Sequence, residues 1–401
     1  MKTLAAVLLC AAAFLALSGL ALAAPAGESS PEPSFAAEPS PEPPAVASPA
    51  PSDETQVQNE LGTAAGVDQI EGQAPPEVGE ILGDAGVGSA SLDSSLGKIG
   101  AYVKGQILGI FQSGLKSAAL ILTVVILCGV ADSVLDTDRE LGANFVPMGG
   151  ALAIAAVSAG DLTAFVGLGA GTLNTLSDFA KVLLPSLAAS ATAAGALTSG
   201  SAKYLATALF LNLLITAAQS VILPMVYAYI AAVIANAAIG GAALDGAVRL
   251  LRWLCIAFLT ALVLAFTVYL SLTGIISGAS DQVSTKVAKT TISAALPVVG
   301  GILSDAAGSL VAGASLLRNG IGIFGLLAVI CVCLLPFLRL GVHYLLYKIT
   351  AGLSGAMSGG RLTALISGLG TAFGLVMALV GTGAMMLFLS ILSSLKGFGL
   401  A

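Results

Sequence analysis

The feature that most limits the possible fold is the long stretch of residues 97–401, which is apolar almost throughout. Hydrophobic residues make up 57% of the whole chain and charged residues only 9%, whereas a soluble domain carries about a quarter charged residues. Such a chain has too few polar side chains to cover a surface exposed to water. We therefore predict an all-α fold, a polytopic transmembrane helix bundle that follows a disordered acidic N-terminal tail.

Charge divides the chain into two parts. Residues 1–96 contain one Lys and 13 acidic residues, and residues 97–401 contain 15 Lys or Arg and nine acidic residues. The basic residues of the second part form no dense cluster of the kind that binds nucleic-acid phosphates. We expect a lipid bilayer as the surroundings of this part and no nucleic-acid partner.

The first 96 residues are predicted to lie outside the membrane domain. Residues 1–23 combine Lys2, an apolar run and an Ala-Leu-Ala ending, which is typical of a secretory signal peptide cleaved after Ala23; an uncleaved anchor is the alternative. Residues 24–96 are rich in Pro, Ser, Glu and Gly. They cannot bury enough apolar surface to fold, so we expect a disordered extracytoplasmic tail with at most one or two short helices after residue 60.

Residues 97–114 have apolar side chains at helical spacing and lysines on the remaining face, which predicts an amphipathic helix in the membrane interface. Residues 115–401 form the predicted transmembrane domain, with seven or eight spans of about 20 residues each. Residues 182–199 are only mildly apolar, and a re-entrant hairpin is the alternative there. The predicted spans are 115–131, 145–165, 182–199, 204–221, 224–243, 253–277, 319–340 and 363–393.

The distribution of positive charge predicts the orientation. With the tail outside the cell, alternate crossings place the basic loop at Arg249 and Arg252 in the cytoplasm, as the positive-inside rule requires. Lys98 and Lys104 then lie on the outer side and count against this assignment. The same alternation puts four further basic residues inside: Lys203, Arg339, Lys348 and Arg361.

Glycine recurs within the apolar stretches as pairs four residues apart, at 167/171, 274/278 and 370/374. Glycine lets helix backbones approach closely in lipid, so these pairs indicate helix packing, either between subunits or within one chain. The sequence GIGIFG at 320–325 matches a dinucleotide-binding pattern, but it opens an apolar helix and follows no strand. Close helix packing is the better interpretation.

No known catalytic motif is present, and we predict no enzyme activity, no cofactor and no metal site. The motifs HExxH, GxSxG and GxxxxGK[ST] are all missing, and the five cysteines contain no CxxC pair. A lone histidine, His343, stands at the end of a predicted span, where a structural role is the common one. Polar residues inside the spans are better candidates for function, because each is costly in lipid unless it is paired or hydrated.

Asp161 is the acidic residue placed most deeply in a predicted span, so a proton or ion relay would begin there; a position at the membrane interface is the alternative. The further intramembrane polar candidates are Asn212, Gln219 and Asn236.

The most distinctive segment is 278–318, where charges alternate with apolar residues and Pro and Gly interrupt the middle. We predict two short amphipathic helices joined at 297–301, on the outer side of the membrane. Broken helices at membrane depth occur in protein or beside water-filled cavities. The segment is therefore either a gate, pore lining or docking surface, or an interfacial hairpin that covers the bundle. Its candidate functional residues are Lys286, Lys289, Pro297, Gly300, Asp305, Arg318 and Asn319.

This segment resembles the stage III sporulation protein AE family of endospore-forming bacteria. The resemblance rests on Lys286-x-Ala288-Lys289, Pro297-Val298-x-Gly300, Asp305-Ala306-Ala307, Leu316-Leu317-Arg318-Asn319 and Gly322-Ile323-x-Gly325. It extends over roughly residues 100–400, and the overall order of signal peptide, variable tail and apolar body supports it.

The resemblance implies a multi-pass protein of the mother-cell membrane around the forespore. It implies a sporulation-specific, secretion-like channel complex between mother cell and forespore, required for spore development. The partners implied are stage III sporulation proteins AA to AH and stage II sporulation protein Q, and a homo-oligomer is possible. It implies no cofactor and no catalytic residue. Two alternatives from the residues themselves are a self-sufficient secondary transporter for a small solute or ion and a purely structural anchor.

Overall fold

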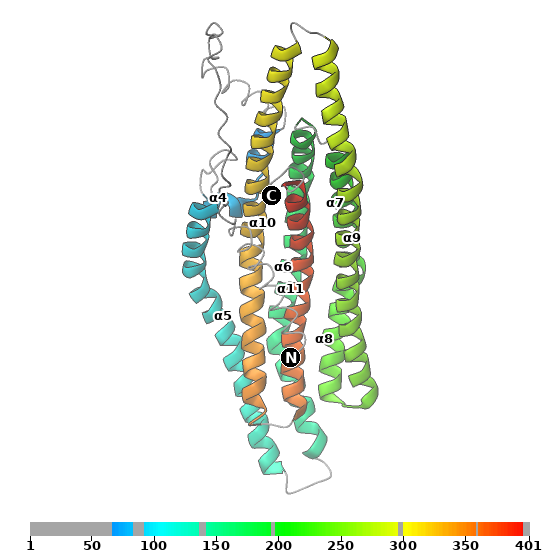
Figure 1. Cartoon of the computed structure of the whole chain (residues 1–401). Coiled ribbons are helices and arrows are strands. Elements are labelled where there is room, and N and C mark those ends of the chain that lie inside the picture. Colours follow the sequence, from blue (N-terminus) through cyan, green and yellow to red (C-terminus); the bar gives the residue numbers. More distant parts are fainter. Residues whose placement is uncertain are drawn as a thin grey trace, which may run out of the picture. The chain divides into compact units, whose positions relative to one another are not determined.

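The computed structural model describes residues 66–82, 92–135, 142–193, 197–295, 300–357 and 360–395. The chain separates into two units, residues 1–55 and 56–401, and all described residues belong to the second. The described residues form helices without a strand, which confirms the all-α prediction (Figure 1).

Two short helices, α3 (Val67–Gly72) and α4 (Pro76–Leu82), precede the long ones. The long helices are α5 (Leu92–Leu135), α6 (Gly142–Ala193), α7 (Leu197–Ala217), α8 (Leu223–Ala238), α9 (Ala242–Ala295), α10 (Gly300–Ser354) and α11 (Gly360–Leu395), with a π-helical turn, η1 (Ala218–Ile222), between α7 and α8.

Six helices over the described residues are long and apolar enough to cross a membrane, two fewer than the eight predicted spans. Predicted span 145–165 and most of 182–199 lie in α6, and 204–221 and most of 224–243 lie in the continuous run α7–η1–α8. Residues 182–193 therefore form the end of α6 and no re-entrant hairpin. Residues 97–114 likewise continue without a break into 115–131 as parts of α5.

Proline explains why two spans look separate in the sequence. Pro224 has no N–H to donate to the carbonyl four residues earlier, and its ring crowds that carbonyl. The helix widens just before it, where the N–H of Leu223 bonds the carbonyl of Ala218, five residues back. This π turn lets α7 and α8 form one membrane-crossing run, so Pro224 causes no helix end.

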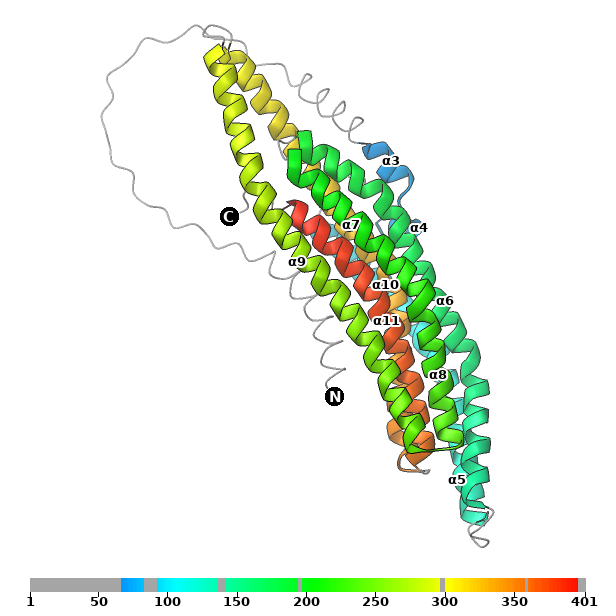
Figure 2. The same ribbon diagram turned by 90° about the vertical axis from the view of Figure 1, so that its right-hand side faces the viewer.

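Helix α11 lies at the centre of the bundle. It contacts α6, α7, α8, α9 and α10, and 72% of its most apolar stretch is buried, against 22% for α5 (Figure 2). Glycines permit this close packing: a Cβ at Gly368 would lie 2.5 Å from Val233, and one at Gly383 would lie 2.7 Å from Leu173. The 320–325 motif behaves as predicted, because a Cβ at Gly322 would meet Leu395 at 2.6 Å.

The helix connections lie at two opposite ends of the bundle. At one end, a Cβ at Gly129 of α5 would meet the carbonyl oxygen of Met357, and Gly240 in the α8–α9 turn faces the guanidinium of Arg361. Gly240 and Gly241 have φ values of 76° and 135°, which residues with a Cβ rarely adopt, and they make this turn possible. The start of α7 lies at the other end, so Lys203 and Arg249 lie at opposite ends of the bundle. This corrects the prediction that placed both on the same side of the membrane. The prediction counted α6 as two spans and so placed one crossing too many before Lys203.

Two helices continue past the ends of the others, and furthest past the end of α11 (Figure 1). Gly322 of α10 packs beside Leu395, the last residue of α11. Helix α10 begins at Gly300, so about 20 residues, or about 30 Å, precede this contact. Helix α9 runs on to Ala295, and α6 and α7 reach part of the way along these extensions (Figure 1). Residues 278–318 thus form the ends of two long helices on either side of 296–299, and the two short helices predicted there are not seen (Figure 1).

Exposed aromatic side chains lie toward both ends of the membrane-crossing part of the bundle. Tyr227 and Trp253 lie at nearly equal distances on either side of the α8–α9 turn, with 46% and 63% of their surfaces exposed. Tyr204 and Tyr269 lie toward the other end, 23 and 16 residues away along these helical runs. These separations correspond to about 34 and 24 Å of helix. They bracket the roughly 30 Å hydrocarbon core, and Tyr and Trp favour its two interfaces.

Candidate functional site

A cluster of polar side chains joins α6, α10 and α11 inside the bundle. Its centre is Lys348, whose ammonium donates hydrogen bonds to the carbonyl oxygen of Ser367 at 2.8 Å, to the hydroxyl of Ser367 at 2.8 Å and to the hydroxyl of Thr371 at 3.0 Å. Ser367 and Thr371 are one turn apart on α11, so both hydroxyls face the same lysine. None of these three acceptors is a carboxylate, so the cation is held by dipoles.

Asp161 lies beside this cluster. The hydroxyl of Tyr347 donates to the Asp161 carboxylate at 3.4 Å, across from α10 to α6. Tyr347 is completely buried, and the buried hydroxyl of Ser158, one turn before Asp161, has no hydrogen-bond partner among the described residues. Asp161 itself is partly exposed. The arrangement couples a carboxylate to a phenol, two kinds of group that can pass a proton.

His343 has a structural environment. Its ring lies 4.4 Å from the Phe165 ring and 5.9 Å from the Phe373 ring, measured between centroids. Its Nδ1 lies 2.9 Å from the carbonyl oxygen of Arg339, and only 4% of the residue is exposed. These contacts fix the ring between three helices, as expected for a histidine that packs.

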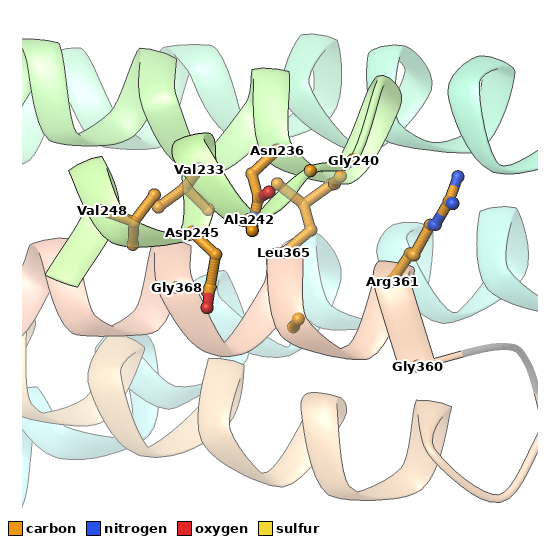
Figure 3. A pocket seen from close by; sticks show the side chains of 13 residues that line it. Val233, Asn236, Gly240, Ala242, Asp245, Val248, Gly360, Arg361, Leu365 and Gly368 are labelled. Atoms are coloured by element: carbon orange, nitrogen blue, oxygen red, sulfur yellow. The ribbon is translucent and has the colours of Figure 1, made fainter.

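A hollow of about 440 Å³ opens at the end of the bundle that carries the α8–α9 turn. It lies between the end of α8, the start of α9 and the start of α11 (Figure 3). Asn236, Asp245 and Arg361 supply its polar groups, and Asp245 also forms an exposed ion pair with Arg249 at 3.0 Å. The hollow is open to the outside and is lined by both apolar and polar residues, so it does not enclose a ligand.

The candidates in segment 278–318 are not brought together into a site. Lys286 and Lys289 lie in the last turns of α9, Gly300 begins α10 and Asp305 follows one turn later. The side chains of Lys286, Lys289 and Asp305 lie outside the described ones, as does the whole of Pro297. Arg318 is buried, with 3% of its surface exposed, and Asn319 beside it is exposed.

The intramembrane amide residues occupy different places. Asn236 lines the hollow. Asn212 is exposed on α7, and Gln219 is exposed two turns further along the same run. The amide nitrogen of Gln219 approaches the Asn174 amide oxygen on α6 at 3.5 Å.

The sequence alone does not indicate Lys348, Ser367 and Thr371 as a cluster. It places Lys348 at a cytoplasmic helix end, because positive charge is common there. The spacing of Ser367 and Thr371 by four residues puts both on one helix face and is the available signal. Only the packing of α10 on α11 shows that the lysine faces them.

Within the described residues, no group of three or more His, Cys, Asp or Glu side chains could hold a metal ion. Cys255, Cys331 and Cys333 are free and buried, and Cys128 is free and partly buried.

Comparison with known proteins bears on the whole length of this bundle. A family model described as "Stage III sporulation protein AE" matches residues 84–395, a range that includes every long helix from α5 to α11. The chain belongs to the stage III sporulation protein AE family. It is therefore a multi-pass membrane protein with a role in sporulation.

A curated member of the stage III sporulation protein AE family, from Bacillus subtilis (strain 168), is 22% identical to this chain over 219 residues. The alignment covers 55% of each protein, so the chain spans about half the length of that relative in this match. No solved structure matches the chain.

Proposed function

We propose that this chain is the membrane core subunit of a sporulation-specific, secretion-like channel complex between mother cell and forespore. The extension of α9 and α10 past the rest of the bundle carries this proposal. About 20 residues suffice to cross a bilayer, whereas these helices have 54 and 55 residues. The surplus forms two helical arms on the far side from the α8–α9 turn, which we call the α9–α10 hairpin. It is long enough to meet proteins outside the membrane.

The proposed orientation follows from the same geometry. The end with Arg249, Arg252 and Arg361 faces the cytoplasm of the mother cell, as the positive-inside rule favours. The α9–α10 hairpin and the N-terminal tail then face the space between the two membranes. The partners are other stage III sporulation proteins of the set AA to AH and stage II sporulation protein Q, as the family resemblance implies.

Shortening the hairpin tests this function. Removing residues 283–289 from α9 together with residues 304–310 from α10 shortens both arms by about two helical turns and keeps their faces in phase. We expect normal amounts of membrane-inserted protein, loss of partner proteins from affinity purification out of sporulating cells, and a large drop in heat-resistant spores. The matched control replaces Lys286, Lys289 and Asp305 with alanine at full length. Full spore yield from the shortened chain would contradict the proposal.

A secondary transporter is the second candidate, because Asp161 and Tyr347 form a hydrogen-bonded pair of proton-active groups. The Asp161→Asn variant separates the two functions. An amide keeps the shape of the side chain and still accepts the Tyr347 hydrogen bond, but it cannot exchange a proton at physiological pH. We expect normal protein levels and normal spore yield. Loss of spores from a protein that is stable and retains its partners would favour the transporter.

A further inference from the structure

Two basic side chains from different helices lie close together near one membrane interface. Arg252 of α9 and Lys348 of α10 are both partly exposed, and they are near enough for their charges to repel each other. Arg252 directly precedes Trp253, one of the exposed aromatic residues that favour the interface. An anion placed between the two cations would attract both, so this position favours a negatively charged ligand.

The side chains around this pair supply positive charge and hydroxyl groups. Among the described residues, Lys348 donates only to Ser367 and Thr371, which are uncharged. The Ser367 hydroxyl accepts one of these bonds, and no described residue accepts its own proton. The Tyr344 ring centroid lies 5.8 Å from the Lys348 ammonium, and the charge of Arg252 reaches the Tyr344 phenol. We call these residues the basic cluster; it consists of Arg252, Tyr344, Lys348 and Ser367.

The protein surface changes from polar to apolar on the membrane side of the basic cluster. Helix α11 lies between α10 and α9 in the view of Figure 1. Along it, small residues that the neighbouring helices cover only in part follow Thr371, namely Gly374, Ala378 and Gly381. The rings of Tyr344 and Phe337, from α10, lie against the first and the last of these residues. Ile256, one turn beyond Arg252 on the same face of α9, is 36% exposed.

The length of this apolar surface matches half of a bilayer. Phe337 lies 11 residues before Lys348 on α10, which corresponds to about 16 Å of helix. One leaflet contributes about 15 Å to the hydrocarbon core. A lipid whose headgroup lies at Lys348 would therefore have room for its acyl chain beside α11.

We propose that the basic cluster binds the phosphate of an anionic membrane lipid, with one acyl chain along α11 between α9 and α10. The order of the side chains matches that of a lipid, because charges and hydroxyls lie at the interface and apolar groups lie toward the membrane centre. Basic pockets between transmembrane helices bind acidic headgroups in this way. The site does not depend on the channel function, since it requires only that the chain spans a membrane.

The charge of the cluster also predicts which headgroup is preferred. Phosphatidylglycerol has a net negative charge, so both cations attract it. The ammonium group of phosphatidylethanolamine would instead be repelled by Arg252 and Lys348. We therefore expect selectivity for phosphatidylglycerol over lipids with no net charge.

The single tryptophan of the chain provides the measurement. Trp253 adjoins Arg252 and is 63% exposed, so nearby lipids with brominated acyl chains quench its fluorescence. The full chain is reconstituted in phosphatidylcholine vesicles that contain increasing fractions of one brominated lipid. We expect brominated phosphatidylglycerol to bind roughly tenfold more strongly than brominated phosphatidylcholine, and brominated phosphatidylethanolamine to show no such preference. A parent chain without a preference for phosphatidylglycerol overturns the proposal, and this result needs no variant.

Arg252→Gln is the test variant, and Arg249→Gln is its matched control. Both remove one positive charge from the same part of α9, but Arg249 is exposed and forms an ion pair with Asp245. We expect Arg252→Gln to lower the preference for phosphatidylglycerol about fivefold, and Arg249→Gln to lower it less than about twofold. Equal losses in the two variants would show that general surface charge attracts the lipid, which rejects a specific site.

Competition with glycerol 3-phosphate distinguishes a lipid from a soluble phosphate ester. This compound carries the negative charge but has no acyl chain. Present on both sides of the vesicle membrane, it should leave the quenching by brominated phosphatidylglycerol unchanged. Recovery of Trp253 fluorescence would show that the cluster binds soluble phosphates, and the assignment to a lipid would be wrong.

Discussion

Replacing Gly368 with leucine is expected to destabilise the protein strongly, because this glycine sets the distance between α8 and α11. A Cβ at this position would lie 2.5 and 3.1 Å from the two methyl groups of Val233. The hydroxyl of Tyr229 also donates to the Gly368 carbonyl at 3.2 Å, and separating the helices would lengthen this bond. Overpacking of this kind costs about 1–3 kcal/mol, and the lost hydrogen bond adds to it.

Thermal unfolding in detergent, followed by circular dichroism, measures this effect. We expect a clearly lower unfolding temperature for Gly368→Leu and no decrease for Gly109→Leu, whose new side chain has free space on the surface of α5. The control also gains about 0.8 kcal/mol of helix propensity over glycine. Equal unfolding temperatures for the two variants would contradict the close α8–α11 packing.

Removing the acceptors around Lys348 is the second change with a large expected effect. In the double variant Ser367→Ala, Thr371→Val, the ammonium keeps only the Ser367 carbonyl of its three acceptors. A hydrogen bond to a charged group contributes about 1.5–3 kcal/mol, and the partly buried Lys348 loses two such bonds in this variant. We therefore expect a large fall in stability, measured by the same unfolding experiment.

A third substitution distinguishes the role of the charge from that of the hydroxyls. Adding Lys348→Met to the double variant removes the stranded cation while keeping a side chain of similar length. The triple variant should be more stable than the double one, since replacing all members of an interacting polar cluster by apolar residues is often neutral or favourable. Additive losses across the series would show that Lys348 does not depend on Ser367 and Thr371.

The helical, membrane-spanning nature of the chain can be predicted because it depends on average composition, which needs no knowledge of contacts. The number of spans depends on local features, such as prolines within a helix, that the average composition does not show. Pro185 and Pro224 suggest helix ends, but Pro185 lies inside α6 and Pro224 follows a π turn that absorbs its missing hydrogen bond. The sequence does not show whether a helix can adjust to a proline.

The roles of glycines depend still more on packing. The 167/171 and 370/374 pairs have the same spacing, and the sequence leaves two interpretations open for both. In the structure Gly370 and Gly374 lie against Tyr347 and Tyr344 of the same chain, whereas Gly167 and Gly171 meet nothing within 4 Å. The 274/278 pair has no described side-chain surroundings.

The partner of Asp161 could not be predicted either. The sequence indicates Asp161 as a candidate because an acidic residue is rare inside a span. Its contact, Tyr347, comes from a helix 186 residues away. Such a pairing depends on how α6 packs against α10, and no local pattern of residues records it.

The central position of α11 has a consequence for biogenesis. This helix is the last of the described ones to leave the ribosome, yet it supplies the surface on which α6, α7, α8, α9 and α10 pack. Until it inserts, the earlier helices can cross the bilayer individually but lack their common neighbour. A premature stop codon before Gly360 should therefore leave an inserted but unassembled product for membrane proteases to degrade.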